Sequence, residues 1–224
     1  MIFAMKGLKL VERGVCWRVT VEGWVLISII LFGLAYFSLT SIHGFLAVHQ
    51  PVESEVLVLE GWLSDRAVED LLQEVRINQY QSIIAAGGKR LKGAYLTDFE
   101  TSADQLRATL IKLGIDSSFI QVVRNPLMKK DRTYSTALEV KQWINQSGGN
   151  IESINVVTVG PHGRRSKLLY ELAMGKNIAV GVINIPDFDY SPERWWNSSA
   201  GVRAVLGESI AYIYSKLFFY PSHE

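Results

Sequence analysis

The sequence predicts an α/β protein, with a Rossmann-like parallel sheet that has helices on both faces and is preceded by one transmembrane helix. From Val56 to Phe219, short and continuously apolar runs alternate with longer segments of helical periodicity. This alternation is typical of strands buried on both faces of a parallel sheet. Before it, Gly23 to Val52 contains no Asp, Glu, Lys or Arg. A helix needs roughly 20 apolar residues to cross a bilayer, and this run is long enough.

The transmembrane helix is expected at residues 23–48, after a cytoplasmic N-terminal segment at 1–22. Basic residues flank its N-terminal side, so the positive-inside rule keeps the N-terminus in the cytoplasm. We therefore expect a single-pass plasma-membrane protein with an extracytoplasmic C-terminal domain. A cleaved signal peptide is the alternative, but the apolar run is longer than the hydrophobic region of a usual signal peptide, and Leu46-Ala47-Val48 is a poor small-residue cleavage site. The basic residues are Lys6, Lys9, Arg13 and Arg18.

Residues 49–55 are expected to form a short linker, and residues 56–220 are of ordinary size for one domain. The net charge of +1 excludes the basic surplus of a nucleic-acid-binding protein. The single cysteine, Cys16, precedes the apolar run, so the outer domain cannot form an internal disulfide. Cys16 is either a site of acylation or an inert small residue.

The outer domain is expected to contain five strands and five helices. The first helix has Ser64 or Asp65 as its cap, and Gly114 and Gly175 end two of the others. The expected strands are 56–59, 83–86, 119–123, 155–159 and 178–185, and the expected helices are 65–79, 101–113, 133–145, 164–174 and 204–219.

Ligands of open parallel sheets bind beyond the carboxyl ends of the strands, where the strand order reverses. Four loops are expected to meet there, and they are rich in glycine, arginine and acid–base side chains. They are Glu60-Gly61-Trp62, Gly87-Gly88-Lys89-Arg90, the segment from Arg124 to Arg132, and the segment from Gly160 to Arg165.

These loops favour an anion site. Glycines such as Gly87 and Gly88 let backbone N–H groups approach an anion closely, and helix N-termini near Thr133 and Arg164 point positive charge toward it. Arginines offer bidentate contacts to phosphate or carboxylate, here Arg132, Arg164 and Arg165.

Acid–base chemistry is expected from His162, which we take as the only histidine within the folded region, because His43 and His49 flank the membrane helix. Glu60 would orient His162 or act itself. Glu208, in the last helix, is expected as a buried partner for an arginine.

Each of these features also has a purely structural interpretation. Gly87-Gly88 can be a simple turn, and Lys129-Lys130 a solvated loop. Arg132 can pair with Asp131, and His162 can act as a capping residue. The sequence has no Walker loop, no nucleophile elbow, no metal-binding Cys/His cluster and no full G-x-G-x-x-G. It therefore predicts no metal and no dinucleotide cofactor.

Taken in order, several of these landmarks resemble the DUF218 family of YdcF-like envelope proteins. The resemblance covers Val56 to Phe219, and it departs from the family pattern at the first loop, at Ala86 and at Ser135-Thr136. The matching segments are Ala86-Gly87-Gly88, Thr133 to Thr136, the strand from Val156 to Val159 with His162 to Arg165, and Glu208.

The resemblance implies a Rossmann-like fold, often membrane-anchored, with Thr133, Thr136 and Glu208 among the ligand-binding residues. It links the protein to the cell envelope and to lipid carriers. We expect a protein that acts on an anionic small molecule, phosphorylated or lipid-linked, at the bilayer. A non-catalytic binding module and a structural module of the envelope remain the alternatives, so enzymatic activity is left open.

Overall fold

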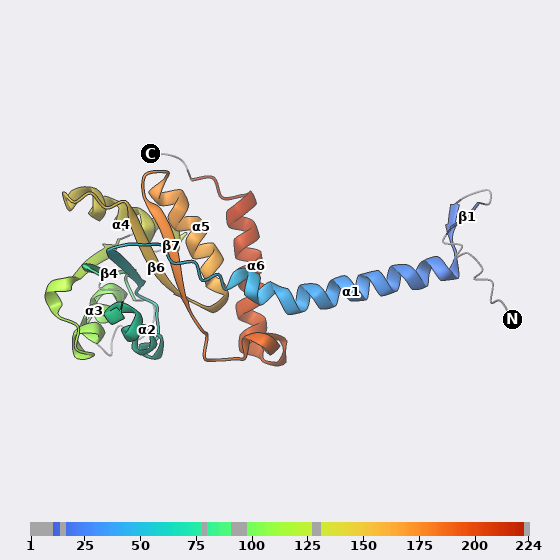
Figure 1. The fold of residues 1–224 in the computed structure, drawn as a ribbon, viewed down its shortest axis with the longest axis horizontal. Coiled ribbons are helices and arrows are strands. Elements are labelled where there is room, and N and C mark those ends of the chain that lie inside the picture. Colours follow the sequence, from blue (N-terminus) through green and yellow to red (C-terminus); the bar gives the residue numbers. More distant parts are fainter. Residues whose placement is uncertain (1–10, 14–16, 78–79, 91–97, 127–130, 222–224) are drawn as a thin grey trace. The chain divides into compact units, whose positions relative to one another are not determined.

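The computed structural model describes residues 11–13, 17–77, 80–90, 98–126 and 131–221. The chain divides into two compact units, Met1–Ile42 and His43–Glu224. Figure 1 labels many of the elements described below. In the first unit, β1 (Val11–Arg13) and β2 (Trp17–Val19) form an antiparallel pair that the sequence did not predict.

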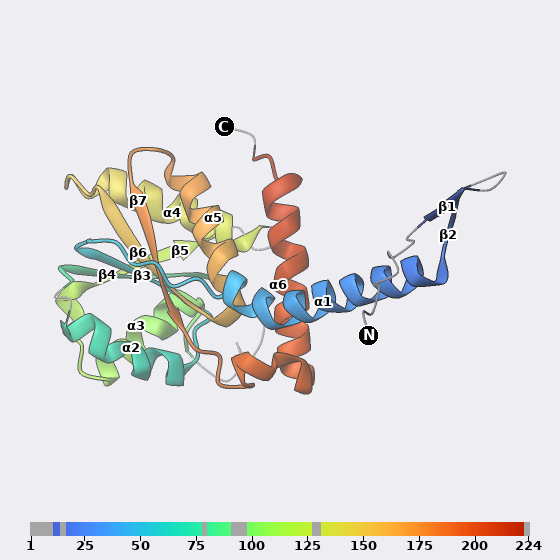
Figure 2. The same ribbon diagram turned by 45° about the vertical axis from the view of Figure 1, so that its right-hand side comes forward.

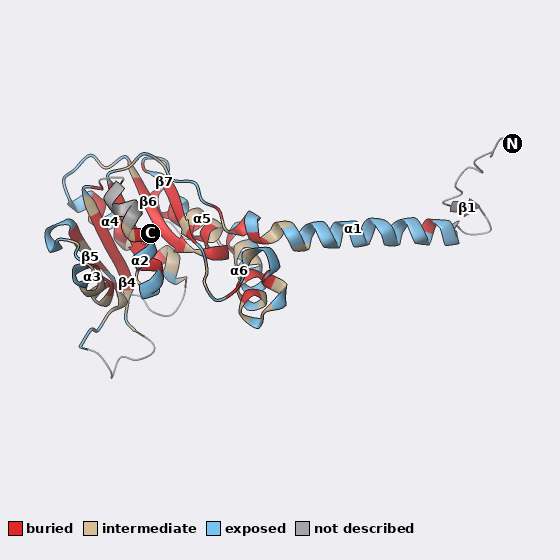
Figure 3. Ribbon diagram, turned by 60° about the horizontal axis from the view of Figure 1, so that its bottom comes forward, coloured by how far each residue is buried: buried red, intermediate tan, exposed pale blue. Residues whose placement is uncertain are grey.

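Helix α1 (Val21–Leu46) begins in the first unit and ends in the second. It begins two residues before the predicted start, where the Thr20 hydroxyl accepts a hydrogen bond from the Gly23 amide. Its side chains are mostly exposed (Figure 3). Among the described residues, α1 alone is long and apolar enough to cross a membrane.

The second unit contains the predicted parallel sheet, with five strands in the order β5-β4-β3-β6-β7. All neighbouring strands are parallel. The strands are β3 (Val56–Glu60), β4 (Ser82–Gly88), β5 (Ile120–Asn125), β6 (Ser153–Val159) and β7 (Ala179–Ile185).

Helices cover both faces of this sheet, as predicted, with α2 and α3 on one side and α4 and α5 on the other (Figure 2). The helices of the second unit are α2 (Asp65–Ile77), α3 (Ser102–Lys112), α4 (Arg132–Gln146), α5 (Gly163–Met174) and α6 (Ser199–Leu217).

Two hydrophobic clusters hold these layers together, because successive side chains of a strand point to opposite faces. Leu57 and Leu59 of β3 pack in the cluster that contains α2 and α3. Val56 and Val58 pack in the cluster that contains α4 and α5. Strand β3 therefore buries both of its faces, and β4, β6 and β7 are also buried along most of their length, which explains why these strands are largely apolar in sequence.

The segment before β3 differs from the sequence prediction. His43 was expected to flank a membrane helix outside the folded domain, but it is only 8% exposed, and its Nε2 lies 3.2 Å from the hydroxyl of Tyr190. His162 is therefore not the only histidine in the folded unit. The predicted linker also packs on the sheet, since Gln50 forms an antiparallel bridge with Val182 of β7.

Candidate functional site

The strand order reverses between β3 and β6. From β3 the chain runs outward through β4 to β5, then crosses to the other side of β3 to form β6 and β7. In such sheets the reversal opens a crevice at the carboxyl ends of the two central strands. Glu60 is the last residue of β3, and His162 follows β6 within the 3₁₀ turn Gly160–His162.

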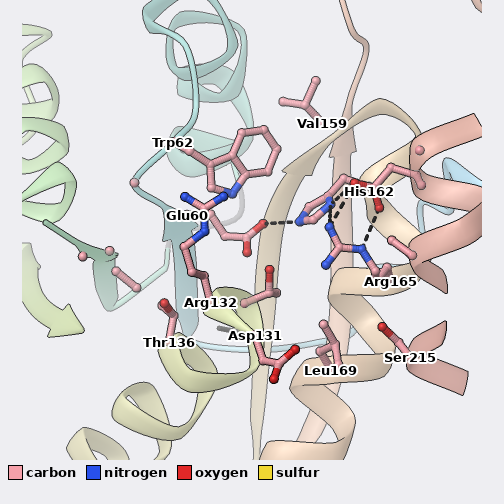
Figure 4. A pocket seen from close by; sticks show the side chains of 18 of the residues that line it. Glu60, Trp62, Asp131, Arg132, Thr136, Val159, His162, Arg165, Leu169 and Ser215 are labelled. Atoms are coloured by element: carbon pink, nitrogen blue, oxygen red, sulfur yellow. Dashed lines mark hydrogen bonds and ion pairs between the residues drawn. The ribbon is translucent and has the colours of Figure 1, made fainter. Parts of the chain in front are cut away.

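A pocket of about 660 Å³ lies at this reversal (Figure 4). It is bounded by the ends of β3, β4 and β5, by the first turns of α3, α4 and α5, and by one side of α6. The lining includes all the predicted site residues except Arg164, namely Glu60, Gly87, Gly88, Arg132, Thr133, Thr136, His162, Arg165 and Glu208.

His162 lies between two carboxylates. Its Nδ1 is 3.0 Å from Oε1 of Glu208, and its Nε2 is 3.7 Å from Oε2 of Glu60. The second distance exceeds hydrogen-bond length, so Nε2 is buried without a hydrogen-bond partner among the described residues. The indole ring of Trp62 covers the imidazole edge-on, at 5.0 Å between ring centroids.

Glu208 accepts two hydrogen bonds from Arg165. Nε of Arg165 lies 2.7 Å from Oε2 of Glu208, and Nη2 lies 2.9 Å from Oε1. Burial by itself would raise the pKa of Glu208, but the hydrogen bonds from His162 and Arg165 outweigh burial and lower this pKa to about 2. Glu208 is therefore a carboxylate at neutral pH, and it fixes both neighbours.

Two tautomers of His162 fit this arrangement. If Nδ1–H donates to Glu208, Nε2 carries a lone pair and can accept a proton. If Nδ1 instead accepts from Nη2 of Arg165, which lies 2.9 Å away, Nε2 carries a proton and faces Glu60. The imidazole can therefore take up a proton at Nε2 or release one, while Nδ1 stays held by the same two side chains.

Glu60 is a buried carboxyl group, only 3% exposed, that accepts a hydrogen bond from the Ser166 hydroxyl at 3.1 Å. Burial raises the pKa of Glu60, and the nearby charge of His162 offsets this only in part. Burial and the charge of Glu60 together raise the pKa of Tyr170, which keeps its phenol neutral. Glu60 and His162 form a close acid–base pair, which is common at catalytic sites.

The glycine-rich side of the pocket is built by close packing of α3 on the ends of β3 and β4. A side chain at Gly61 would bring its Cβ to 2.7 Å from Oγ of Ser102, and one at Gly87 would meet the same hydroxyl. Ser102 donates to the carbonyl of Gly88 at 3.2 Å. Glycine is needed here so that the first turn of α3 can approach the strand ends.

Asn125, the last residue of β5, holds the first turn of α4 in place. Its buried amide donates to Oγ of Ser135 at 2.8 Å and to Oγ1 of Thr136 at 2.9 Å. The start of α4 thus faces the pocket, and the side chain of Arg132 points into it (Figure 4). Among the described residues, no acidic side chain forms an ion pair with Arg132, and Asp131 is therefore not its partner.

Arg164 does not lie in the pocket, unlike its neighbour Arg165. Its guanidinium stacks over the Phe45 ring at 3.9 Å, and its Nε donates to the Phe45 carbonyl. Successive residues of a helix point about 100° apart, so only one of two adjacent arginines can face the sheet reversal. We therefore remove Arg164 from the anion site.

Sequence reasoning assigned no role to several polar or aromatic lining residues, among them Trp62, Ser102, Asn125 and Arg203. Trp62 and Asn125 do lie in loops that the sequence analysis identified. Asn125 ends a strand, and ligand-binding residues of parallel sheets gather at such strand ends. Arg203 belongs to α6, and nothing local in the sequence links it to the strand ends. Lys129-Lys130 lies outside the described residues.

Comparisons with family models, with curated proteins and with solved structures find no significant match for this chain. The site is therefore interpreted from its own geometry.

Proposed function

We propose that this is a membrane-anchored, DUF218-like protein whose pocket binds an anionic cell-envelope metabolite, phosphorylated or lipid-linked, and performs acid–base chemistry on it. One observation carries the proposal. A single pocket contains arginines without an ion-pair partner among the described residues, next to the Glu60–His162 pair.

Binding of the anion would depend on Arg132, Arg203 and the start of α4. Both arginines are exposed on the pocket wall, so their charges are free to meet a ligand. The first N–H groups of α4 add partial positive charge in the same direction. Gly87 and Gly88 line the same pocket, and their backbone would be open to close approach by an anion.

Proton transfer would depend on Nε2 of His162, which is buried, unpartnered among the described residues and close to Glu60. With Nε2 unprotonated, His162 can accept a proton from an attacking water molecule. The resulting imidazolium, stabilised by Glu60 and Glu208, can return the proton to a leaving oxygen. Arg165 is a positioning residue, because its guanidinium is bound to Glu208.

The membrane part of the proposal is supported by α1, whose length and composition fit a bilayer span. A pocket in the domain that follows such an anchor directly would be suited to a ligand with a lipid tail. We place the N-terminus in the cytoplasm and the domain outside it, on the basis of the basic residues before α1.

A non-catalytic binding module is the second candidate. It is favoured by the hydrogen-bond network of Glu208, His162 and Arg165, in which each side chain contacts the other two. Such a network can hold the pocket walls without moving a proton.

Farnesyl diphosphate, which joins an anionic group to a short lipid tail, is a suitable probe. Binding to the full chain in detergent can be measured by calorimetry, and release of phosphate or diphosphate by ³¹P NMR. We expect Arg132→Ala to weaken binding at least tenfold, and His162→Ala to lower turnover by about 10²- to 10⁴-fold with little effect on binding. Lys112→Ala, on α3 outside the pocket, is the matched control.

Three results separate the candidates. Loss of turnover but not of binding in His162→Ala supports the enzyme. Binding without turnover in the parent protein supports the binding module. Absence of binding, or binding that Arg132→Ala leaves unchanged, contradicts the anion site itself.

A further inference from the structure

Helix α6 exposes a continuous apolar stripe on the side that does not line the pocket. Its residues recur at spacings of four, three and four positions, which places them on one face of a helix. Much of α6 is accordingly coloured as exposed or intermediate in Figure 3. The stripe consists of Leu206, Ile210, Ile213 and Leu217, which are 51%, 71%, 52% and 56% exposed.

Aromatic residues follow the stripe at its C-terminal end, where Phe218 and Tyr220 are 66% and 83% exposed. A soluble surface rarely carries so many large apolar side chains side by side, so the patch indicates a binding surface. Tyrosine at the edge of an apolar patch is typical of the boundary between water and lipid.

The last turn of α1 contacts α6. Phe45, in the last turn of α1, packs edge-on against Tyr212 of α6 at 5.7 Å between ring centroids. Arg164 holds the other side of the Phe45 ring. Helix α6 is therefore in direct contact with the last turn of the helix that can span a bilayer.

Charge also favours a lipid surface. By helical projection, Arg203 and Lys216 flank the stripe on opposite sides, and both are exposed. The only acidic residue of α6, Glu208, is turned into the pocket and bound to Arg165. A helix with an apolar face bordered by cations fits a membrane surface that contains anionic headgroups.

A second copy of the chain fits the stripe less well. Two helices that pair through apolar stripes with this spacing usually carry complementary charges beside the stripes. The positions beside the stripe are Arg203, Gly207, Ser209, Tyr214 and Lys216, which offer no acidic partner for either cation.

We propose that the stripe of α6 lies in the headgroup and upper acyl region of the bilayer, as a second membrane contact besides α1. This contact does not depend on whether the pocket binds an anion. Because Arg203, Gly207 and Tyr214 of the same helix line the pocket, the contact would set the pocket close to the lipid surface.

The test uses the full chain with Cys16→Ser and a nitroxide label at Ile210→Cys, in vesicles of phosphatidylcholine with one quarter phosphatidylglycerol. Ile210 is 71% exposed, so labelling leaves the core intact. Relaxation by oxygen, which concentrates in lipid, is compared with relaxation by a water-soluble nickel chelate. We expect the label to be at least threefold more sensitive to oxygen than a label at the control position Lys112→Cys, and protected from nickel.

A label at Leu217→Cys should behave like that at Ile210 and serves as the second variant. Equal nickel accessibility at Ile210, Leu217 and Lys112 would overturn the proposal. Strong spin–spin broadening between labels, which disappears when labelled protein is diluted with unlabelled protein, would overturn it in favour of a second copy.

Discussion

Replacing Glu208 with Gln should lower the free energy of unfolding of the second unit by about 3 kcal/mol at pH 7. The carboxylate is held by Arg165 and His162, which lower its pKa from 4.5 to about 2. Each pKa unit corresponds to about 1.4 kcal/mol, so ionised Glu208 is about 3 kcal/mol more favourable in the folded state than neutral Glu208. Glutamine resembles the neutral form and loses this difference.

The loss should depend on pH in a defined direction. Because the folded-state pKa of Glu208 lies below the unfolded-state value, its contribution is complete above about pH 5 and declines as the pH falls toward 2. The parent protein and Glu208→Gln should therefore differ most near pH 7 and converge at low pH.

Urea unfolding of the full chain in detergent, followed by tryptophan fluorescence at pH 7, 5 and 3, measures this difference. Glu171→Gln is the matched control, since Glu171 is half exposed and lies 3.9 Å from Lys167. It should change the free energy of unfolding by less than about 0.5 kcal/mol. A loss below about 1 kcal/mol for Glu208→Gln at pH 7, or the same loss at every pH, would refute the reasoning.

Three further predictions use the same unfolding assay. Burial raises the folded-state pKa of Glu60 above its usual value of 4.5, so the parent loses stability as the pH rises above that value, and Glu60→Gln should become progressively more stable than the parent; a constant difference would contradict this. Gly87→Ala should cost about 1–3 kcal/mol because its Cβ meets Ser102, whereas Gly207→Ala, with open space around it, should gain about 0.5–1 kcal/mol; equal effects would count against the packing argument. Asn125→Ala should cost about 1–3 kcal/mol by removing a buried donor to two hydroxyls, and a neutral result would contradict its role in holding α4.

Most strands could be predicted closely because a strand buried on both faces is largely apolar, whatever its neighbours are. The start of α6 was predicted less well, at residue 204 instead of Ser199. Its first turn contains Gly201, which packs against the Trp195 backbone, and its N-cap is the hydroxyl of Ser198. Glycine has low helix propensity, so the sequence signal there is weak.

The position of the site followed from chain topology, but the role of each side chain did not. Arg164 and Arg165 are equivalent in the sequence, and their contacts with distant residues separate them: Arg164 stacks on Phe45, whereas Arg165 pairs with Glu208. The burial of His43 depends in the same way on Tyr190, 147 positions along the chain. Contacts of this kind join distant segments and leave no local pattern.

The central claim is that the pocket at the strand reversal binds an anion beside an acid–base pair. The most direct test is a crystal structure of the full chain with farnesyl diphosphate. We predict diphosphate oxygens within hydrogen-bond distance of the Arg132 guanidinium and of the backbone amide of Gly87 or Gly88, next to Nε2 of His162. A diphosphate bound elsewhere on the protein, with this pocket empty at saturating probe, would contradict the claim.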